Sequence, residues 1–517
     1  MDAAGSVVDS LVIRDGRVAF AGRRGDINPA PGEPTLDVGG RAVLPGLVDG
    51  HGHLMLLARA RLELNLAAAG SEDEIARLVG AAAARRRPGE WITGRGWDQT
   101  RWPGQAFPTR ASLDRAAPGH PVALIRVDGH ATWASGEALT RAGITRHSGD
   151  PPGGLIAKSA NGEPTGLLID LAQDIIRGLV PAPAEERFDQ AVRETIAECL
   201  AKGLTGAHEP GLDLSAVASY TRLIERGLFP FRVFAALSGQ KAWGRYRDGS
   251  PETVGDGRLV VGAVKLWLDG ALGSRGAALH APYCDDPANT GLVLVPPEDV
   301  ERLAREVSAR GFHVWVHAIG DRANTMVLDV FERVRAGGGP QSRLRVEHAQ
   351  ILAPSDIPRF ARLGVVPSMQ PTHCTSDMRW AGERLGPERL AGAYAWRSVL
   401  DTGAYLAGGS DFPVEDANPF HGLHAAVTRR PLDGPDPGWQ PEQRMTREEA
   451  VRSFTIWNAR SIGLDADQGS LEVGKRADLI ALSDDVFTCA PAAIARITPT
   501  LTMMAGLVVA GGSPVPD

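Results

Sequence analysis

The chain has 517 residues, of which 43% are hydrophobic and 23% charged, and its formal net charge is −7. A chain of this length predicts several domains or one large barrel with additions. The small net charge, with acidic residues spread along the chain, argues against nucleic acid and membranes as partners and favours a small-molecule substrate. The sequence has no run of about 20 apolar residues and no signal-peptide pattern, so it predicts a cytoplasmic protein.

Short apolar, β-branched runs alternate with amphipathic stretches along most of the chain. This pattern predicts parallel strands joined by crossover helices. Eight runs are expected to be strands: residues 42–49, 204–208, 231–236, 261–268, 313–316, 344–347, 365–370 and 404–407. Eight strand–helix units predict an α/β fold, a (β/α)₈ TIM barrel that occupies residues 42–466.

Two further parts interrupt or flank this barrel. About 150 residues separate the first and second runs, so we expect a subdomain inserted after strand one, at about residues 60–200, on the catalytic face. Residues 11–22 predict a hairpin around Asp15 and Gly16. Similar short strands near the other end predict a small β-sandwich built from residues 1–41 and 467–517.

The end of the first run carries a possible metal-binding pair. Residues 44–53 read Leu-Pro-Gly-Leu-Val-Asp-Gly-His-Gly-His. Side chains two residues apart on a strand share a face, so His51 and His53 can present two imidazoles to one point. Such a pair alone often has no function.

Polar residues also follow the other predicted strands. Because catalytic groups lie at the carboxyl ends of barrel strands, we expect one mouth to collect them: His208, Glu209, Lys265, Asp269, His317, His348 and Asp411. An isolated histidine there is often only structural. Lys265 is harder to explain that way, because a buried ammonium costs several kcal/mol unless it is paired, coordinated or chemically altered.

Several longer motifs resemble a known family. They include Gly-Arg-Gly-Trp-Asp at 94–98, Asp-Gly-His-Ala-Thr-Trp-Ala-Ser at 128–135, Val-Lys-Leu-Trp-Leu-Asp-Gly at 264–270, His-Ala-Ile-Gly-Asp-Arg-Ala-Asn at 317–324, Arg-Val-Glu-His-Ala-Gln at 345–350 and Gly-Ser-Asp-Phe-Pro-Val at 409–414. Together they resemble the metal-dependent amidohydrolase superfamily, and within it the YtcJ-like branch (amidohydrolase family 3) that includes N-substituted formamide deformylases.

The resemblance implies a site with two divalent metal ions. His51, His53 and Asp411 would bind the more buried ion, His317 and His348 the second, and an N-carboxylated Lys265 would bridge them. Imidazole and carboxylate ligands suit Zn²⁺ and tolerate Mn²⁺, Fe²⁺ or Co²⁺. The family also implies a homodimer.

The implied reaction is hydrolysis of an amide-type C–N bond in a small molecule, such as an N-substituted formamide or N-acyl amine. A metal-bridging hydroxide would attack the carbonyl carbon, and Asp411 would be the catalytic proton shuttle. A mononuclear deaminase of an amino-substituted ring, a carbamate or ester hydrolase and a non-catalytic assembly protein are the alternatives. The bridging Lys265 argues against the deaminase.

Substrate contacts are expected from two regions. Trp97, Asp98 and His130 lie in the insertion, where aromatic residues suggest an apolar substrate group or simply the core of the subdomain. Asp269 and Arg275 follow strand four, although Arg275 could equally pair with a local acid such as Asp285. The loop at 274–278, Ser-Arg-Gly-Ala-Ala, departs from the family pattern and could reshape the pocket.

The four cysteines are too few and too scattered for a disulfide framework. Cys374 follows His373, but neighbours on a chain usually point apart, so a nucleophilic pair is disfavoured.

Overall fold

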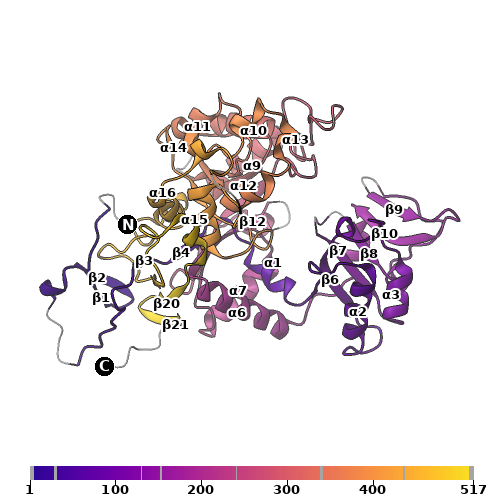
Figure 1. The fold of residues 1–517 in the computed structure, drawn as a ribbon, viewed down its shortest axis with the longest axis horizontal. Helices are drawn as coiled ribbons and strands as arrows, with labels where there is room; N and C mark the ends of the chain where they lie inside the picture. Colours follow the sequence, from indigo (N-terminus) through magenta and orange to yellow (C-terminus); the bar gives the residue numbers. More distant parts are fainter. Residues whose placement is uncertain are drawn as a thin grey trace. The chain divides into compact units, whose positions relative to one another are not determined.

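The computed structural model describes residues 5–27, 32–127, 129, 131–151, 154–239, 242–337, 342–432, 434 and 437–511, apart from the side chains of Thr100 and Asp170. The chain packs into two compact units, which we call unit 1 (residues 1–55 and 193–517) and unit 2 (residues 56–192). Two helices, α1 (Leu54–Ala60) and α6 (Glu185–Ala201), contain the points where the chain passes from one unit to the other (Figure 1).

Unit 1 is built on an eight-stranded parallel barrel, as the sequence predicted. The strands follow the order β4, β11, β12, β14, β15, β16, β17 and β18, and each neighbouring pair is parallel. Their bounds are β4 (Leu47–Asp49), β11 (Leu204–Leu212), β12 (Arg232–Ser238), β14 (Leu259–Trp267), β15 (His313–Ala318), β16 (Leu344–His348), β17 (Val366–Met369) and β18 (Ala407–Gly408). A short strand, β13 (Glu252–Val254), pairs antiparallel with β14.

The barrel is closed between its first and last strands by single hydrogen bonds rather than by a ladder. The backbone N–H of Gly50 donates to the carbonyl oxygen of Gly408 at 2.8 Å. The amide of Asn458 donates to the carbonyl oxygens of Val48 and Gly408 at 2.8 and 2.9 Å. The carboxyl ends of strands one and eight therefore lie side by side.

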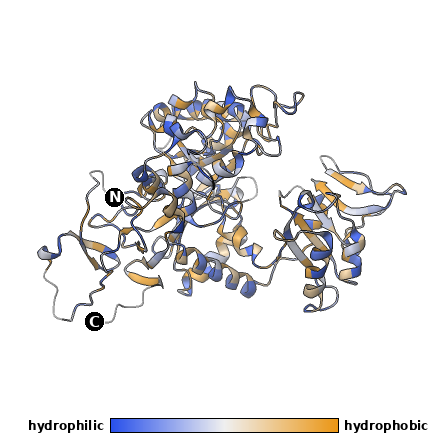
Figure 2. Ribbon diagram, in the orientation of Figure 1, coloured by the Kyte–Doolittle hydropathy of each residue, from blue (hydrophilic) through white to orange (hydrophobic). Residues whose placement is uncertain are grey.

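Helices on the outside of the barrel bury one face and expose the other. In α9 (Pro297–Ala309), proline opens the helix, two acidic residues occupy the first turn, and Val300, Ala304 and Val307 form the buried stripe. Figure 2 shows this mixture of hydrophilic and hydrophobic residues on the helices. The other helices of unit 1 are α7 (Leu214–Glu225), α8 (Trp243–Tyr246), α10 (Asp321–Ala336), α11 (Ile357–Leu363), α12 (Pro371–Asp377), α13 (Ala381–Leu385), α14 (Trp396–Leu400), α15 (Pro419–Thr428), α16 (Arg447–Ser453) and α17 (Ile456–Ser461).

The first predicted strand, residues 42–49, is in fact two strands in two different sheets. Its first half, β3 (Val43–Pro45), pairs with β19 (Leu479–Leu482), and its second half, β4, belongs to the barrel. Gly46 divides them, and a Cβ added there would lie 2.3 Å from a methyl carbon of Thr205. Only glycine fits this crossing of chains.

The two ends of the chain meet in small antiparallel sheets. One sheet has the order β21 (Leu507–Gly511), β20 (Pro499–Met504), β19 and β3. The hairpin of β1 (Ser10–Arg14) and β2 (Arg17–Gly22) forms the other, as its Asp-Gly turn predicted. Leu11 and Ile13 of the hairpin pack against a core from β19 and β20 that includes Leu479 and Leu501.

Unit 2 has its own mixed sheet and its own core. The strand order is β5 (Leu64–Asn65), β6 (Ile92–Trp97), β7 (Val122–Arg126), β8 (Ala131–Ala134), β10 (Pro164–Asp170) and β9 (Gly154–Lys158). The helices that belong wholly to this unit are α2 (Glu72–Ala83), α3 (Arg110–Ala116), α4 (Gly136–Arg141) and α5 (Gln173–Arg177). Trp97, Trp102 and Trp133 lie together in the core, with ring centroids 6.0 to 6.3 Å apart.

Among the described residues, no helix combines the length and the apolar character needed to span a bilayer.

Candidate metal centre

The expected ligands lie at or just beyond the carboxyl ends of the barrel strands in unit 1. His51 and His53 follow β4, Lys265 lies within β14, and His317 lies within β15. His348 is the last residue of β16, and Asp411 follows β18.

Asp49 joins the chain segments that carry the first and last of these groups. Its carboxylate accepts hydrogen bonds from the backbone N–H groups of His51 and Ser410 and from the Ser410 hydroxyl, at 3.0, 3.1 and 2.6 Å. The N–H of Asp411 donates to the carbonyl oxygen of His51 at 2.6 Å. Gly409 must lack a side chain, because a Cβ would lie 2.5 Å from the His51 nitrogen. The two segments are thus fixed against each other.

Three buried side chains form the centre of the site. His51, His348 and Asp411 each offer one ligand atom, and these three atoms all lie within 4.8 Å of one another. They are close enough to bind the same metal ion. The Asp411 Oδ1 atom is 3.6 Å from His51 Nε2 and 3.1 Å from His53 Nε2. The rings of His317 and His348 have centroids 4.6 Å apart. We call His51, His53, His317, His348 and Asp411 the ligand cluster.

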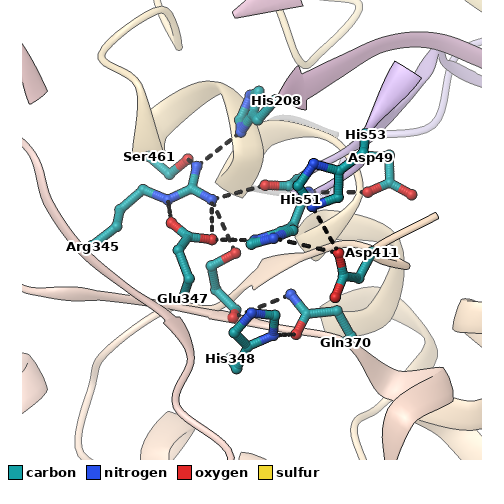
Figure 3. A network of polar contacts seen from close by, with 12 residues as sticks. Asp49, His51, His53, His208, Arg345, Glu347, His348, Gln370, Asp411 and Ser461 are labelled. Atoms are coloured by element: carbon teal, nitrogen blue, oxygen red, sulfur yellow. Dashed lines mark hydrogen bonds and ion pairs between the residues drawn. The ribbon is translucent and has the colours of Figure 1, made fainter. Parts of the chain in front are cut away.

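Two polar side chains fix the tautomers of the central histidines (Figure 3). Glu347 lies 2.5 Å from His51 Nδ1, and the amide oxygen of Gln370 lies 2.8 Å from His348 Nδ1. Each acceptor places a proton on Nδ1, which leaves Nε2 with a free lone pair for a metal. For His317, the Nε2 atom lies 3.5 Å from the Gly270 carbonyl oxygen, which leaves Nδ1 for that role.

A buried arginine supports Glu347 from behind. Arg345 is fully buried and pairs with Glu347 at 2.9 and 3.1 Å. Its remaining donors reach His208 Nδ1 at 2.9 Å and the Gly50 carbonyl oxygen at 2.8 Å, and its guanidinium stacks 4.0 Å above the Trp315 ring. His208, which the sequence placed at a strand end, thus faces the arginine and supports the barrel interior.

The pKa values of the ligand cluster favour the binding of a cation. Burial lowers the pKa of His51 to about 4 and that of His317 to about 3, and it holds the pKa of His348 well below its usual value. These imidazoles are therefore neutral near pH 7, the form that binds metals. Burial opposes ionisation of Asp411, but His51 and His53 outweigh it and hold the pKa of this carboxyl well below its ordinary value. A carboxylate beside imidazoles is a donor set that suits Zn²⁺ and similar ions.

Lys265 is buried beside this cluster. Its ammonium is influenced by Glu347 and Asp411, and burial lowers its pKa to about 8. In the part of the chain that the structure describes, no hydrogen bond or ion pair to its Nζ is found. The ammonium lies 5.6 Å from the centroid of the Trp267 ring. A buried amine with a lowered pKa and no hydrogen bond is unusual for a purely structural lysine.

Two residues of the ligand cluster have a left-handed backbone conformation, His348 with a φ angle of 72° and Asp411 with a φ angle of 61°. Ala349, which follows His348, also has a positive φ angle, 42°. Residues other than glycine seldom adopt this region. Strain of this kind concentrates at functional sites, where the surrounding contacts hold it.

Of the substrate contacts expected from the insertion, Trp97 has a structural position. Its side chain is fully buried in the core of unit 2, and its indole N–H donates to the Leu124 carbonyl oxygen at 2.8 Å. This burial leaves no face of the indole for a substrate. Asp98 is partly exposed and pairs with Arg126 at 2.9 Å, and His130 lies outside the described residues.

The two residues expected to contact the substrate after strand four both have partners within the protein. The buried carboxylate of Asp269 accepts hydrogen bonds from the backbone of Ala278, Ile319 and Gly320 at 2.8 to 3.0 Å, and burial raises its pKa to about 7. Arg275 pairs with Asp285 at 2.9 Å, the alternative that the sequence left open. This contact does not direct Arg275 to the ligand cluster, whereas Asp269 Oδ1 lies 3.5 Å from His317 Nε2.

Sequence reasoning missed several residues at the site. Asp49, Glu347 and Gln370 hold the ligands, and His373 Nε2 lies 3.7 Å from Asp411 Oδ2. A signal was present, because Glu347 and Gln370 are polar residues at the ends of apolar strands.

Comparison with known proteins agrees with this geometry. Residues 35–510 match the model of the amidohydrolase family (Amidohydro_3). The chain is 34% identical to "Putative amidohydrolase YtcJ" of Bacillus subtilis, covering 98% of this chain and 96% of that protein. It is 29% identical to the N-substituted formamide deformylase of Arthrobacter pascens, covering 98% and 96%.

A solved structure of similar fold is an uncharacterized metal-dependent hydrolase from Pyrococcus horikoshii OT3. It has a TM-score of 0.80 and 28% identity and covers 93% of this chain and 94% of its own. The family predicted from the sequence is confirmed: the chain belongs to the amidohydrolase family, and it is a hydrolase of the metal-dependent amidohydrolase superfamily.

Proposed function

We propose that this enzyme hydrolyses the C–N bond of a small N-acyl amine, and of an N-substituted formamide in particular. The observation that carries the proposal is the ligand cluster around Asp411 at the carboxyl ends of the barrel strands. The 29% identity to an N-substituted formamide deformylase over nearly the whole chain supports the choice of bond.

The residues fit a site for two divalent ions, with Zn²⁺ as the first choice. His51, His53 and Asp411 would hold one ion, His317 and His348 the other, and N-carboxylated Lys265 would contribute to both. A bound divalent ion supplies a Lewis acid and lowers the pKa of a water molecule to near 7.

Lys265 is suited to carboxylation by carbon dioxide. Only a neutral amine attacks CO₂, and a pKa of about 8 leaves a substantial neutral fraction near neutral pH, far more than an ordinary lysine has. The product is an anion, so modification replaces a buried cation with a charge that divalent metals stabilise.

Asp411 is the group placed to move the proton. Its Oδ1 faces His51 and His53, so Oδ2 is the oxygen that can take a proton from the attacking water. The C–O bond forms, the C–N bond breaks, and the same proton passes from Oδ2 to the departing nitrogen. The products are a carboxylic acid, formic acid in the case of a formamide, and a free amine.

The first experiment is metal analysis of the purified protein beside its Lys265→Ala variant, followed by an assay of amine release from a panel of N-acyl amines. We expect two metals per chain, falling to one or none in the variant, and turnover of formamides or other small amides. Asp411→Asn should reduce turnover by a factor of roughly 10² to 10⁴.

Other outcomes would point to other chemistry. One metal per chain, unaffected by Lys265→Ala, would contradict the two-metal proposal and favour ammonia release from amino-substituted rings. Full turnover by Asp411→Asn with metals bound would exclude Asp411 as the proton carrier.

A further inference from the structure

His373 lies against the ligand cluster, although strand seven of the barrel supplies no expected ligand. It is in α12, which begins directly after β17. Its imidazole is stacked on that of His348, with ring centroids 5.9 Å apart and an interplanar angle of 13°. The side chain is only 13% exposed, so the ring is held within the site rather than in solvent.

The Nε2 atom of His373 faces the second carboxylate oxygen of Asp411. Asp411 directs Oδ1 to the imidazoles of His51 and His53, whereas Oδ2 lies 3.7 Å from His373 Nε2. Within the described ranges, Oδ2 accepts no hydrogen bond, and the buried Nε2 has no hydrogen-bond partner. A buried imidazole nitrogen without a partner thus lies beside a carboxylate oxygen without a donor, and the buried nitrogen is costly unless it pairs.

The residue at the start of α12 already holds one member of the ligand cluster in place. Gln370, the residue that caps α12, fixes His348 through its Nδ1. His373 is three residues further on, which places it on the same face of the first helical turn. One short segment therefore presents one polar side chain to each of two neighbouring cluster residues.

We propose that His373 is a positioning residue for Asp411. The Nε2–H group of His373 donates a hydrogen bond to Asp411 Oδ2 and so keeps Oδ1 directed at the histidines of the ligand cluster. The observed 3.7 Å is about half an ångström beyond a hydrogen bond, a gap that a small side-chain rotation closes. One lone pair of Oδ2 stays free to accept the proton in the proposed reaction. The expected effect of His373 on turnover therefore rests on the proposed function.

The test compares three variants of the full-length protein and uses Co²⁺ as the probe. His373→Leu removes the donor, His373→Gln keeps an amide N–H near the position of Nε2, and His373→Asn places its amide too far back. We expect His373→Leu and His373→Asn to weaken Co²⁺ binding by roughly 10- to 100-fold and to change the visible absorption spectrum of the bound Co²⁺, because groups that hold metal ligands have effects of this size. The affinity of His373→Gln should stay within a few-fold of that of the unaltered protein.

Turnover of the best N-acyl amine gives the second measurement. In His373→Leu and His373→Asn, kcat should fall while KM changes little, whereas His373→Gln should keep most of kcat. The control is His424→Leu, which should leave Co²⁺ binding and turnover unchanged. This histidine is also buried, lies in α15 and has an Nδ1 atom without a hydrogen-bond partner among the described residues.

The two proposals fail in different ways. If no N-acyl amine is hydrolysed by the unaltered protein, the proposed function fails and the Co²⁺ comparison still decides the role of His373. If His373→Leu binds Co²⁺ as the unaltered protein does, or if His373→Gln is as impaired as His373→Leu, then His373 does not hold Asp411 by a hydrogen bond and the inference is overturned.

Discussion

At the scale of single residues, the ligand cluster depends on the groups behind it. A histidine that is free to change its tautomer must lose that freedom when it binds a metal, whereas His51 and His348 are already fixed by Glu347 and Gln370. This preorganisation increases the affinity for a metal ion, because the histidines are ordered when the protein folds and not when the metal binds.

Removing one such partner should weaken the metal site without unfolding the protein. In Gln370→Met the acceptor for His348 Nδ1 is lost, while the volume of the side chain is nearly kept. We expect metal affinity to fall by roughly 10- to 100-fold. In Gln370→Glu the acceptor is kept, so affinity should be preserved or increased. Competition with a coloured chelator measures both variants, and equal affinities in the two would contradict this role of Gln370.

His313 gives a prediction about pH that does not involve the metal. It begins β15, its Nδ1 accepts the Arg343 N–H at 3.1 Å, and its Nε2 faces the Ile462 carbonyl oxygen at 3.2 Å. Burial lowers its pKa to about 4 from the ordinary 6.5. Between these pH values the unfolded chain binds a proton that the folded chain rejects, so stability should decrease as pH falls from 6.5 towards 4, by at most about 1.4 kcal/mol per pH unit.

The matched variant is His313→Asn, which keeps an acceptor for Arg343 and cannot titrate. Its melting temperature should lie below that of the unaltered protein at pH 7, and the difference should shrink as the pH approaches 4. If the difference in melting temperature between the two proteins stays constant from pH 7 to pH 4, then His313 does not bind a proton on unfolding.

At the scale of elements, the periodic pattern of the sequence predicted the barrel well. Each of the eight predicted runs overlaps a barrel strand, because buried parallel strands are continuous apolar runs that sequence patterns reveal. The bounds differ, since β11 continues to Leu212 and residues 404–407 meet β18 only at Ala407. The split of residues 42–49 into β3 and β4 could not be predicted, since it depends on how closely Thr205 approaches Gly46. Apolarity along one run does not say to which sheet each half belongs.

The candidate site was predictable in part for a similar reason. The ligands come at strand ends, where a polar residue after an apolar run is conspicuous, as His348 is. His373 comes after the start of a helix, α12, and approaches Asp411 only because β17, which α12 follows, pairs with β18. Such contacts arise from three-dimensional proximity, so spacing along the chain gives no sign of them.

Unit 2 allows a test of whether Trp97 serves the core or the substrate. In Trp97→Ala the loss of a fully buried indole should destabilise unit 2 by about 3 to 5 kcal/mol. Hydrogen exchange followed by peptide mass spectrometry should show faster exchange in β6 and β7, with protection of the barrel strands unchanged. A raised KM with unchanged exchange would instead give Trp97 a role in substrate binding.

At the scale of the whole molecule, the terminal sheets are joined to the barrel by a buried ion pair. Arg232 of β12 donates to Asp478 at 2.5 and 3.2 Å, and both side chains are at most 10% exposed. Asp478 also accepts the Ala505 N–H at 2.7 Å, and its carbonyl oxygen accepts the Gly46 N–H at 2.9 Å. One residue thus connects β3, β12 and the turn after β20.

Breaking this pair should destabilise unit 1 while leaving its metal content unchanged. Arg232→Met leaves the Asp478 carboxylate buried without its cation, and Asp478→Asn leaves the guanidinium without its anion, so each should cost about 3 to 5 kcal/mol. The double variant removes both charges and should cost less than the two single losses added together. Urea unfolding measures each free energy, and additive losses would show that the two charges do not interact. Because the ligand cluster lies at the opposite, carboxyl ends of the strands, equal metal content in all variants would show that the terminal sheets support the stability of the barrel independently of its chemistry.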